Sequence, residues 1–191
     1  MCNDVVSAAA AVLQNLHFIK SRCVHNKESC IFTICNVTSG HTYNVFPDEA
    51  FMQGTMRTYD ENVLKLMKEK IRTISTHTAE ALGCKAEVEI IDHYPAVINH
   101  AKETDHVVRL AKKWFGEEHF SEEDVPLAAS EDFSYFLLEK PGCFWMLGTK
   151  KPNKPIMTLH TSNYDYNDNL LASGGYLYLR LVEDRLGIRI L

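Results

Sequence analysis

Several features that would place a protein in a specialised class are missing from this sequence. No apolar run approaches the roughly 20 residues that a membrane-spanning helix needs. The first residues are not a basic start followed by an apolar signal region. A net charge of −5 offers no basic surface for nucleic acid or for anionic membranes. We therefore expect a cytoplasmic globular protein that binds neither nucleic acid nor membranes.

The six cysteines include no C-x-x-C pair, so the usual spacing of a metal or redox motif is also missing. Cys30 and Cys35 lie on one predicted strand but are five residues apart, so their side chains should face opposite ways. That geometry disfavours a shared metal or disulfide. We expect buried or free thiols in a reducing compartment.

The first half of the chain has a recognisable order of helical and strand patterns. Apolar residues recur every three or four positions over residues 4–20, and again over residues 60–83, where Asp60 caps a second helix. The patterns over residues 30–37, 44–57 and 85–91 are typical of strands. The order is helix, strand, strand, helix, strand. One further strand in front would make it the ferredoxin-like β-α-β-β-α-β unit.

In that topology the first strand lies inside the sheet, between the third strand and the last. Without it, backbone groups on two neighbouring strands lose their partners, at about 1–3 kcal/mol for each buried group. We therefore expect a ferredoxin-like domain that lacks its first strand. A small open sheet of different strand order is the alternative.

His93-Tyr94-Pro95 interrupts the strand pattern and predicts a boundary, with domains over residues 1–93 and 94–191. In the second domain we expect helices over residues 99–115, from Ser130 to Pro141, and over 170–186. A fully apolar run over residues 143–147 predicts a buried strand. The fold class is therefore α/β (α+β).

His160 stands before a polar stretch of Asn and Asp residues that leads into the last helix. A histidine at such a turn is a candidate metal ligand or acid–base group. An exposed loop histidine is the alternative, and the residue alone does not decide between them.

Several short segments occur in a fixed order along the chain, and together they closely resemble the zinc-dependent aminoacylase and carboxypeptidase family. Within it they resemble the branch of hippurate hydrolases, N-acyl-amino-acid amidohydrolases and auxin-conjugate hydrolases. The segments are Tyr43-Asn44-Val45-Phe46-Pro47-Asp48, Gly54-Thr55-Met56-Arg57, Ala129-Ser130-Glu131-Asp132-Phe133-Ser134, Pro141-Gly142-Cys143-Phe144, Leu147-Gly148 and His160 to Asp168.

The resemblance implies a lid domain that also serves dimerisation, followed by the C-terminal portion of an α/β zinc-peptidase catalytic domain. It implies that His160 is a metal ligand, with zinc as the first choice and manganese, cobalt or nickel as alternatives. It also implies that Arg57 binds the carboxylate of the substrate and that Asn44 contacts the substrate or the oxyanion. Ser130, Glu131 and Asp132 would belong to a substrate-binding loop. A surface ion pair for Arg57, a turn for Asn44 and simple helix capping for the loop are the alternatives.

The family's other metal ligands and its basic glutamate lie upstream of the lid domain and have no counterpart here. One histidine cannot hold a catalytic zinc, which takes about three protein ligands and a water. We therefore expect a portion of a metal-dependent hydrolase of N-acyl amino acids or small peptide-like amides, inactive by itself and dimeric through its first domain. A non-catalytic dimerisation or regulatory module, or a pseudoenzyme fragment, is the competing hypothesis.

Overall fold

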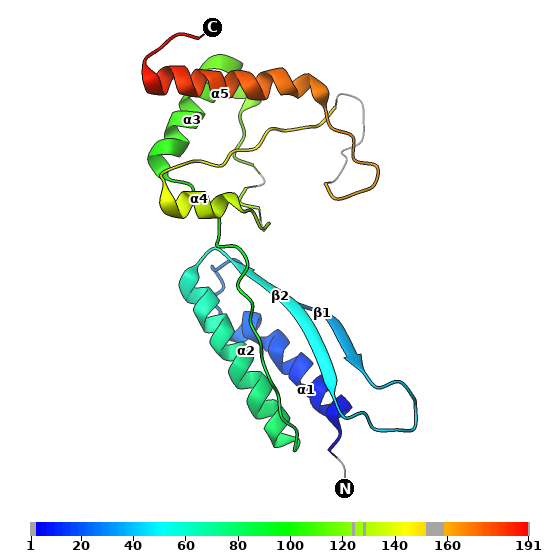
Figure 1. The fold of residues 1–191 in the computed structure, drawn as a ribbon. Coiled ribbons are helices and arrows are strands. Elements are labelled where there is room, and N and C mark those ends of the chain that lie inside the picture. Colours follow the sequence, from blue (N-terminus) through cyan, green and yellow to red (C-terminus); the bar gives the residue numbers. More distant parts are fainter. Residues whose placement is uncertain (1–2, 124, 128, 152–158, 191) are drawn as a thin grey trace. The chain divides into compact units, whose positions relative to one another are not determined.

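The computed structural model describes residues 3–123, 125–127, 129–151 and 159–190 (Figure 1). The chain forms two compact units, residues 1–96 with 128–130 and residues 97–127 with 131–191. The identity of the first as a lid domain stays a prediction. No helix in the described part of the chain has both the length and the apolar character that a membrane span requires.

Two capped helices dominate the first unit. α1 (Val5–Phe18) begins after Asp4, whose carboxylate accepts hydrogen bonds from the N–H groups of Val6 and Ser7. A π-helical turn, η1 (Ile19–Cys23), continues it. α2 (Glu61–Ala81) begins after Asp60, which accepts from Asn62 and Val63 in the same way. The predicted cap at Asp60 is therefore confirmed, since an aspartate oxygen satisfies two otherwise unpaired donors.

The sheet is an antiparallel pair of strands, β1 (Cys30–Ser39) and β2 (Ala50–Thr58). Cys30 is buried and Cys35 is exposed, as their spacing predicted. The register shifts between Ile34 and Asn36, so Cys35 is the extra residue of a β-bulge. The predicted start of the second strand at residue 44 is wrong, because residues 44–49 form a loop and β2 begins only at Ala50.

One apolar core holds the first unit together. The helices α1 and α2 contact each other and the two strands. Ile19 and Met67 are completely buried, and Asn15 of α1 hydrogen-bonds Thr78 of α2 at 3.1 Å. The buried core residues are Val12, Leu16, Ile19, Cys30, Val63 and Met67.

The predicted strand over residues 85–91 is the main departure in this unit. The stretch is assigned to no strand, although its burial alternates as predicted. Alternation is a property of the sequence, but a strand also needs a neighbouring backbone to bond with. Among the described residues that neighbour is missing.

Close packing of the two strands gives a test of the fold. A Cβ added at Gly54 would lie 2.5 Å from the carbonyl oxygen of Thr33, whereas one added at Gly175 of the last helix would meet nothing within 4 Å. We expect Gly54→Ala to lower the free energy of unfolding by about 1–3 kcal/mol. Gly175→Ala should instead raise it by up to about 1 kcal/mol. Urea unfolding followed by circular dichroism measures both, and an unchanged midpoint for Gly54→Ala would contradict the packing.

The second unit contains the helices α3 (Ala101–Phe115), α4 (Phe133–Glu139) and α5 (Leu171–Leu186). Two 3₁₀ turns, η2 (Glu117–His119) and η3 (Asp168–Leu170), join them to the loops. α3 packs against α5. The Arg180 guanidinium of α5 lies 4.2 Å from the ring centre of Trp114 and 4.6 Å from that of Tyr176. Trp114 is 39% exposed, and its ring also lies edge-on to that of Tyr176, with 5.9 Å between the ring centres.

Residues 143–147 form an extended segment and not the buried strand that their apolar character predicted. The side chain of Asn99 takes the place of a partner strand. Its amide donates to the carbonyl of Phe144 and its oxygen accepts from the N–H of Phe144, both at 2.8 Å. A side chain can satisfy the backbone N–H and carbonyl of one residue in an extended segment, but it cannot supply the further backbone hydrogen bonds of a β-ladder.

Candidate functional site

The structure brings together two of the residues that the sequence singled out. Arg57 lies near the end of β2 and is partly buried. Its Nη1 donates a hydrogen bond of 2.9 Å to the hydroxyl oxygen of Ser130. These residues are 73 positions apart in the sequence, and both belong to the first compact unit. The contact helps to orient the guanidinium, and serine is an uncharged acceptor.

Glu131 and Asp132 occupy the start of α4. The carboxylate of Glu131 accepts a hydrogen bond of 3.3 Å from the N–H of Phe133, and its carbonyl accepts one from the hydroxyl of Ser134. Asp132 stands at the N-cap position, but its side chain makes no capping hydrogen bond. Glu131 therefore makes the kind of helix-capping contact that was the alternative to a substrate-binding role. Ser130 does not cap the helix, because the N-cap position is Asp132, and the Ser130 hydroxyl oxygen accepts from Arg57.

Asn44 lies in the loop between β1 and β2, where its side-chain oxygen accepts a hydrogen bond of 3.1 Å from the hydroxyl of Thr42. The loop is at one end of the hairpin (Figure 1), and Arg57 is the second-last residue of β2, at the other end. Seven residue steps separate Ala50 from Arg57, which is roughly 23 Å along a strand. Asn44 and Arg57 of one chain therefore do not converge on one small substrate.

His160 is exposed and lies at a turn with a backbone φ of +64°. It is the one residue other than glycine with a positive φ within the described ranges. This conformation is uncommon for a residue with a side chain, although histidine adopts it more readily than most. Such outliers concentrate at functional sites, where surrounding structure holds them in place.

The described residues do not complete a metal site around His160. No group of three or more His, Cys, Asp or Glu side chains in the described ranges is arranged to hold a metal ion. A catalytic zinc takes about three protein ligands, and the part of the chain that the structure describes does not supply such a set.

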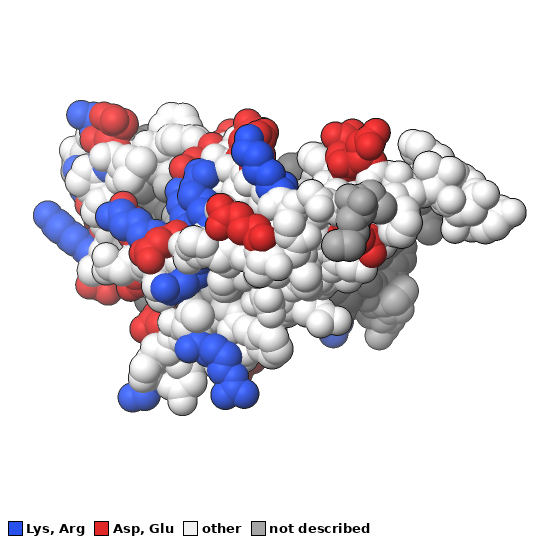
Figure 2. Space-filling model, turned by 90° about the horizontal axis from the view of Figure 1, so that it is seen from below, with Lys and Arg blue, Asp and Glu red and all other residues white. Residues whose placement is uncertain are grey.

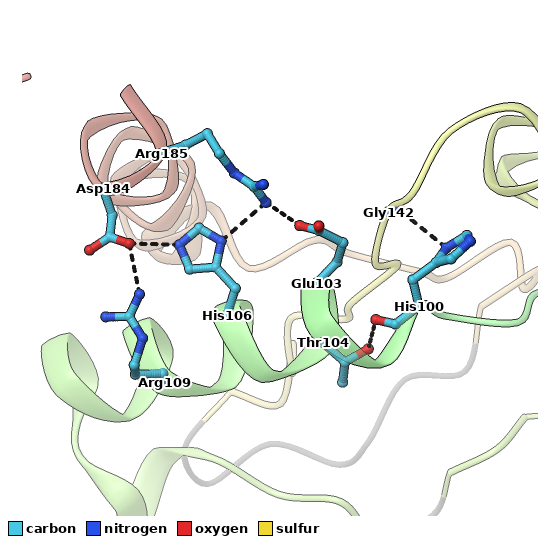
Figure 3. Close-up of polar contacts among 8 residues, drawn as sticks. All are labelled: His100, Glu103, Thr104, His106, Arg109, Gly142, Asp184 and Arg185. Carbon is cyan, nitrogen blue, oxygen red and sulfur yellow. Dashed lines mark hydrogen bonds and ion pairs between the residues drawn. The ribbon is translucent and has the colours of Figure 1, made fainter. Parts of the chain in front are cut away.

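Sequence reasoning missed a charged cluster that joins α3 to α5 (Figure 3). Asp184 of α5 lies 2.9 Å from Nε2 of His106 and 2.7 Å from the guanidinium of Arg109. Arg185 hydrogen-bonds Nδ1 of His106 at 3.3 Å and pairs with Glu103. The cluster lines an open pocket of about 410 Å³. The signal in the sequence is slight, since it consists of Glu103, His106 and Arg109 at a spacing of three on α3 and of the adjacent Asp184 and Arg185 on α5.

Both ring nitrogens of His106 have charged partners. Nδ1 lies 3.3 Å from the guanidinium of Arg185, and Nε2 lies 2.9 Å from the carboxylate of Asp184. A ring with both nitrogens engaged by charged partners is not available to activate a nucleophile, so the cluster fastens two helices together.

The cluster gives a prediction for pH dependence. Hydrogen bonding to Arg109, and then to His106, lowers the pKa of the Asp184 carboxyl, and Arg185 lowers the pKa of Glu103. A carboxyl whose pKa is lower in the folded state stabilises the protein above its unfolded pKa, which is about 4. That contribution is lost as the pH falls through the folded value. The stability of the second unit should therefore decline below about pH 4.

Asp184→Asn removes the carboxylate and tests this origin. The variant should melt at a lower temperature than the native protein at pH 7, and the difference should shrink at about pH 3, as the falling pH approaches the lowered pKa of the native Asp184 carboxyl. Asp105→Asn is a matched control, because Asp105 is exposed on α3 and lines the same pocket. A constant difference in melting temperature between Asp184→Asn and the native protein at both pH values would contradict the assignment.

Charges of both signs are interspersed on the face of the molecule that Figure 2 shows. That distribution does not present a patch of one sign. It agrees with the net charge of −5.

The sequence of this chain is similar to those of known proteins. A model of peptidase family M20/M25/M40 matches residues 6–184. The hippurate hydrolase of Campylobacter jejuni is 32% identical over 93% of this chain and 45% of its own length. The IAA-amino acid hydrolase ILR1-like 4 of Arabidopsis thaliana is 27% identical over 92% of this chain and 41% of its own length. The chain therefore spans less than half of these curated relatives.

A solved structure has a similar fold. The YxeP protein of Bacillus subtilis, described as a dinuclear metal binding peptidase from the M20 family, superposes with a TM-score of 0.78 and 21% identity. The alignment covers 97% of this chain and 47% of YxeP. This likeness confirms the predicted fold class, a mixture of helices and strands that matches a lid domain and part of a catalytic domain.

Proposed function

We propose, on the premise that the chain belongs to peptidase family M20/M25/M40, that it supplies the lid and the C-terminal catalytic portion of a metal-dependent amidohydrolase. The resemblance inferred from the motifs is confirmed by this match. The substrates proposed are N-acyl amino acids or small peptide-like amides. Support comes from relatives named as a hippurate hydrolase and an IAA-amino acid hydrolase.

The observation that carries the proposal is the contact between Arg57 and Ser130. A guanidinium has five N–H donors in a planar fork, and a carboxylate accepts two of them side by side. Ser130 holds Nη1 in place, so the fork is oriented before a substrate arrives. Arg57 would thus bind the carboxylate of the acylated amino acid. A lysine would offer a point charge without this geometry.

His160 would contribute one ligand to a divalent metal in the complete enzyme. Zinc is the first choice, and manganese, cobalt or nickel would also accept an imidazole. The metal, when bound, supplies Lewis acidity toward the amide carbonyl and toward water. Since the described residues include no group of three or more potential metal ligands, we expect the chain alone to hold no catalytic metal and to be inactive. The remaining ligands and the general base would come from residues outside this chain.

Asn44 and Arg57 of the same chain would serve two different substrate sites. The two residues lie at opposite ends of the β1–β2 hairpin, so a single substrate cannot touch both. A homodimer in which the loop of one subunit reaches the site of the other satisfies both roles. There Asn44 would donate a hydrogen bond to the developing oxyanion.

Mixed dimers test this arrangement. The test uses a hybrid enzyme in which this chain replaces the matching portion of the Campylobacter hippurate hydrolase. In that hybrid, the activity of dimers made only of Asn44→Ala subunits, or only of Arg57→Ala subunits, should be impaired. Mixed at random, they should recover about a quarter of the native activity, because half of the dimers are mixed and each mixed dimer has one intact site. No recovery in a dimeric mixture would place both residues in one subunit's site.

A hybrid enzyme tests the function itself. The chain would replace the matching portion of the Campylobacter hippurate hydrolase, and hydrolysis of N-benzoylglycine and other N-acyl amino acids would be measured with added divalent metal. We expect activity in the hybrid and none in the chain alone. The native hydrolase, divided and rejoined at the same position, is the control. A folded, metal-loaded hybrid without activity on any of these substrates would refute the proposal.

The competing candidate is a non-catalytic dimerisation or regulatory module. It is favoured by the lack of a three-residue metal cluster in the described part of the chain. That module would dimerise without conferring hydrolysis on the hybrid. For localisation we propose the cytoplasm, because the described cysteines are free, which suits a reducing compartment.

A further inference from the structure

The loop that joins β1 to β2 carries apolar side chains into solvent (Figure 1). Residues 41–46, which we call the loop tip, are all exposed. Tyr43 is 99% exposed, and Val45 and Phe46 are 62% and 61% exposed. A single exposed apolar residue needs no explanation, but three within four consecutive positions form a patch of the kind that binding surfaces present. The loop tip is therefore a candidate surface for an apolar group.

The base of the loop is held closed, so the loop tip has a defined position. The Ser39 hydroxyl donates a hydrogen bond of 2.9 Å to the carbonyl of Glu49 across the loop. Gly40 has a φ of +65°, and a Cβ added to it would lie 3.5 Å from the ring of Pro47. The two sides of the loop thus approach closely next to the sheet. An ordered loop loses less entropy when a ligand binds to it.

Asn44 connects the loop tip to the proposed reaction. The hydroxyl of Thr42 donates to the side-chain oxygen of Asn44, so the N–H groups of that carboxamide remain for a substrate oxygen. On the proposed function, this oxygen is the oxyanion that develops on the acyl carbonyl. Tyr43 precedes Asn44, and Phe46 follows it by two positions. Since consecutive Cα atoms are about 3.8 Å apart, both aromatic rings are within reach of the group that carries the carbonyl.

The two sides of the scissile amide differ in what they leave for the loop tip to bind. On one side of the carbonyl carbon is the amide nitrogen of the amino acid, whose carboxylate the proposed function assigns to Arg57. On the other side is the acyl group. No residue of the loop tip is Asp, Glu, Lys or Arg. The loop tip therefore suits an uncharged apolar acyl group, and an aromatic one would make ring contacts with Tyr43 and Phe46.

We propose that Tyr43 and Phe46 determine the acyl specificity of the enzyme, favouring an aromatic acyl group over a short aliphatic one. The inference rests on the proposed function and narrows its substrate class. The loop tip belongs to the site that Asn44 serves. In the dimer, the two rings therefore act on a substrate whose carboxylate is bound by Arg57 of the other subunit.

Substrates that differ only in the acyl group test the proposal in the hybrid enzyme. The value of kcat/KM is measured for N-benzoylglycine and for N-acetylglycine. Tyr43→Ser and Phe46→Ser should each lower the ratio of the first value to the second by about tenfold, because the benzoyl ring loses an aromatic contact. The loss on N-acetylglycine should be much smaller, since its methyl group offers no ring for that contact.

Two control variants separate the ring contact from other effects. Tyr43→Phe keeps the ring, so it should retain the native ratio. Phe18→Ser removes an exposed aromatic residue from the end of α1 in the same unit, and it should also retain the ratio. A fall for Phe18→Ser as large as for Tyr43→Ser would overturn the proposal. So would an equal loss on both substrates in Tyr43→Ser; dissociation of that dimer in sedimentation would then identify the loop tip as a contact between subunits.

Heterodimers purified through two different affinity tags show which subunit supplies the rings. When one subunit carries both Arg57→Ala and Tyr43→Ser and the other is native, the single working site combines the native arginine with the changed loop tip. Its ratio should be lowered about tenfold. When Arg57→Ala is in one subunit and Tyr43→Ser is in the other, the working site is native, and its ratio should be native too. The reverse pattern would place the rings in the site of their own subunit and contradict the proposal.

Two different results separate the acyl specificity from the proposed function. An active hybrid whose ratio is unchanged by both Tyr43→Ser and Phe46→Ser would overturn the acyl specificity alone. A folded, metal-loaded hybrid that hydrolyses no N-acyl amino acid would overturn the proposed function and the acyl specificity with it.

Discussion

Replacement of His160 in the hybrid enzyme is expected to reduce hydrolysis of N-benzoylglycine by about a thousandfold. The Lewis acidity of a catalytic metal is worth several kcal/mol, and each 1.4 kcal/mol or so is a factor of ten in rate. Loss of one ligand should also lower the bound metal per site, measured by elemental analysis. Steady-state kinetics and metal content are therefore the two measurements.

The backbone at His160 determines which variants are informative. At a φ of +64° an alanine adds strain, whereas asparagine and glycine adopt this conformation readily. His160→Asn and His160→Gly thus remove the imidazole while preserving the turn. His119→Ala is the control, since His119 is an exposed histidine of the same unit. Unchanged rate and metal content in His160→Asn and His160→Gly would exclude a ligand role.

Replacement of Arg57 is expected to lower kcat/KM for N-acyl amino acids by about 10² to 10³-fold. Truncating one partner of a desolvated charge pair costs 2–5 kcal/mol, and much of that should be seen as a higher KM. Arg57→Lys should recover little of the loss, because an ammonium does not bind a carboxylate in two places. Ser130→Ala should cost about tenfold through the lost orientation of the guanidinium.

The substrate itself offers the sharpest control for Arg57. An amide of N-benzoylglycine has no carboxylate, so the native hybrid and Arg57→Ala should cleave it at similar rates. Arg22→Ala tests for a general effect of charge, because Arg22 is exposed in η1. If the amide substrate loses as much activity as N-benzoylglycine in Arg57→Ala, the residue supports the fold and does not bind the carboxylate.

Local signals in the sequence were sufficient for the helices of the first unit. The predicted range of 4–20 contains α1, and Asp60 and Gly83 bracket α2 as expected, with Gly83 at a φ of +74°. Caps and apolar periodicity act over three or four residues, so a single chain records them directly. Strand positions were less accurate, since the region before Ala50 was predicted as strand and forms a loop.

For the candidate site, the sequence identified the residues but not their partners. His160, Arg57, Asn44, Ser130, Glu131 and Asp132 were chosen through ordered motifs, and their roles remain proposals. The hydrogen bond from Arg57 to Ser130 joins positions 73 residues apart, so no local pattern could predict it. The cluster of His106 with Asp184 joins positions 78 apart for the same reason.

What the sequence by itself determined is the order of the elements, the alternation of side chains and the family motifs, all of which depend on neighbouring residues. What only the tertiary structure decided is which backbones and side chains meet. Residues 85–91 carry the alternation of a strand but pair with no strand in the described part of the chain, because pairing requires a second backbone and not a pattern. Likewise, Asn44 and Arg57 share a motif series, yet the length of β2 holds them at opposite ends of one hairpin.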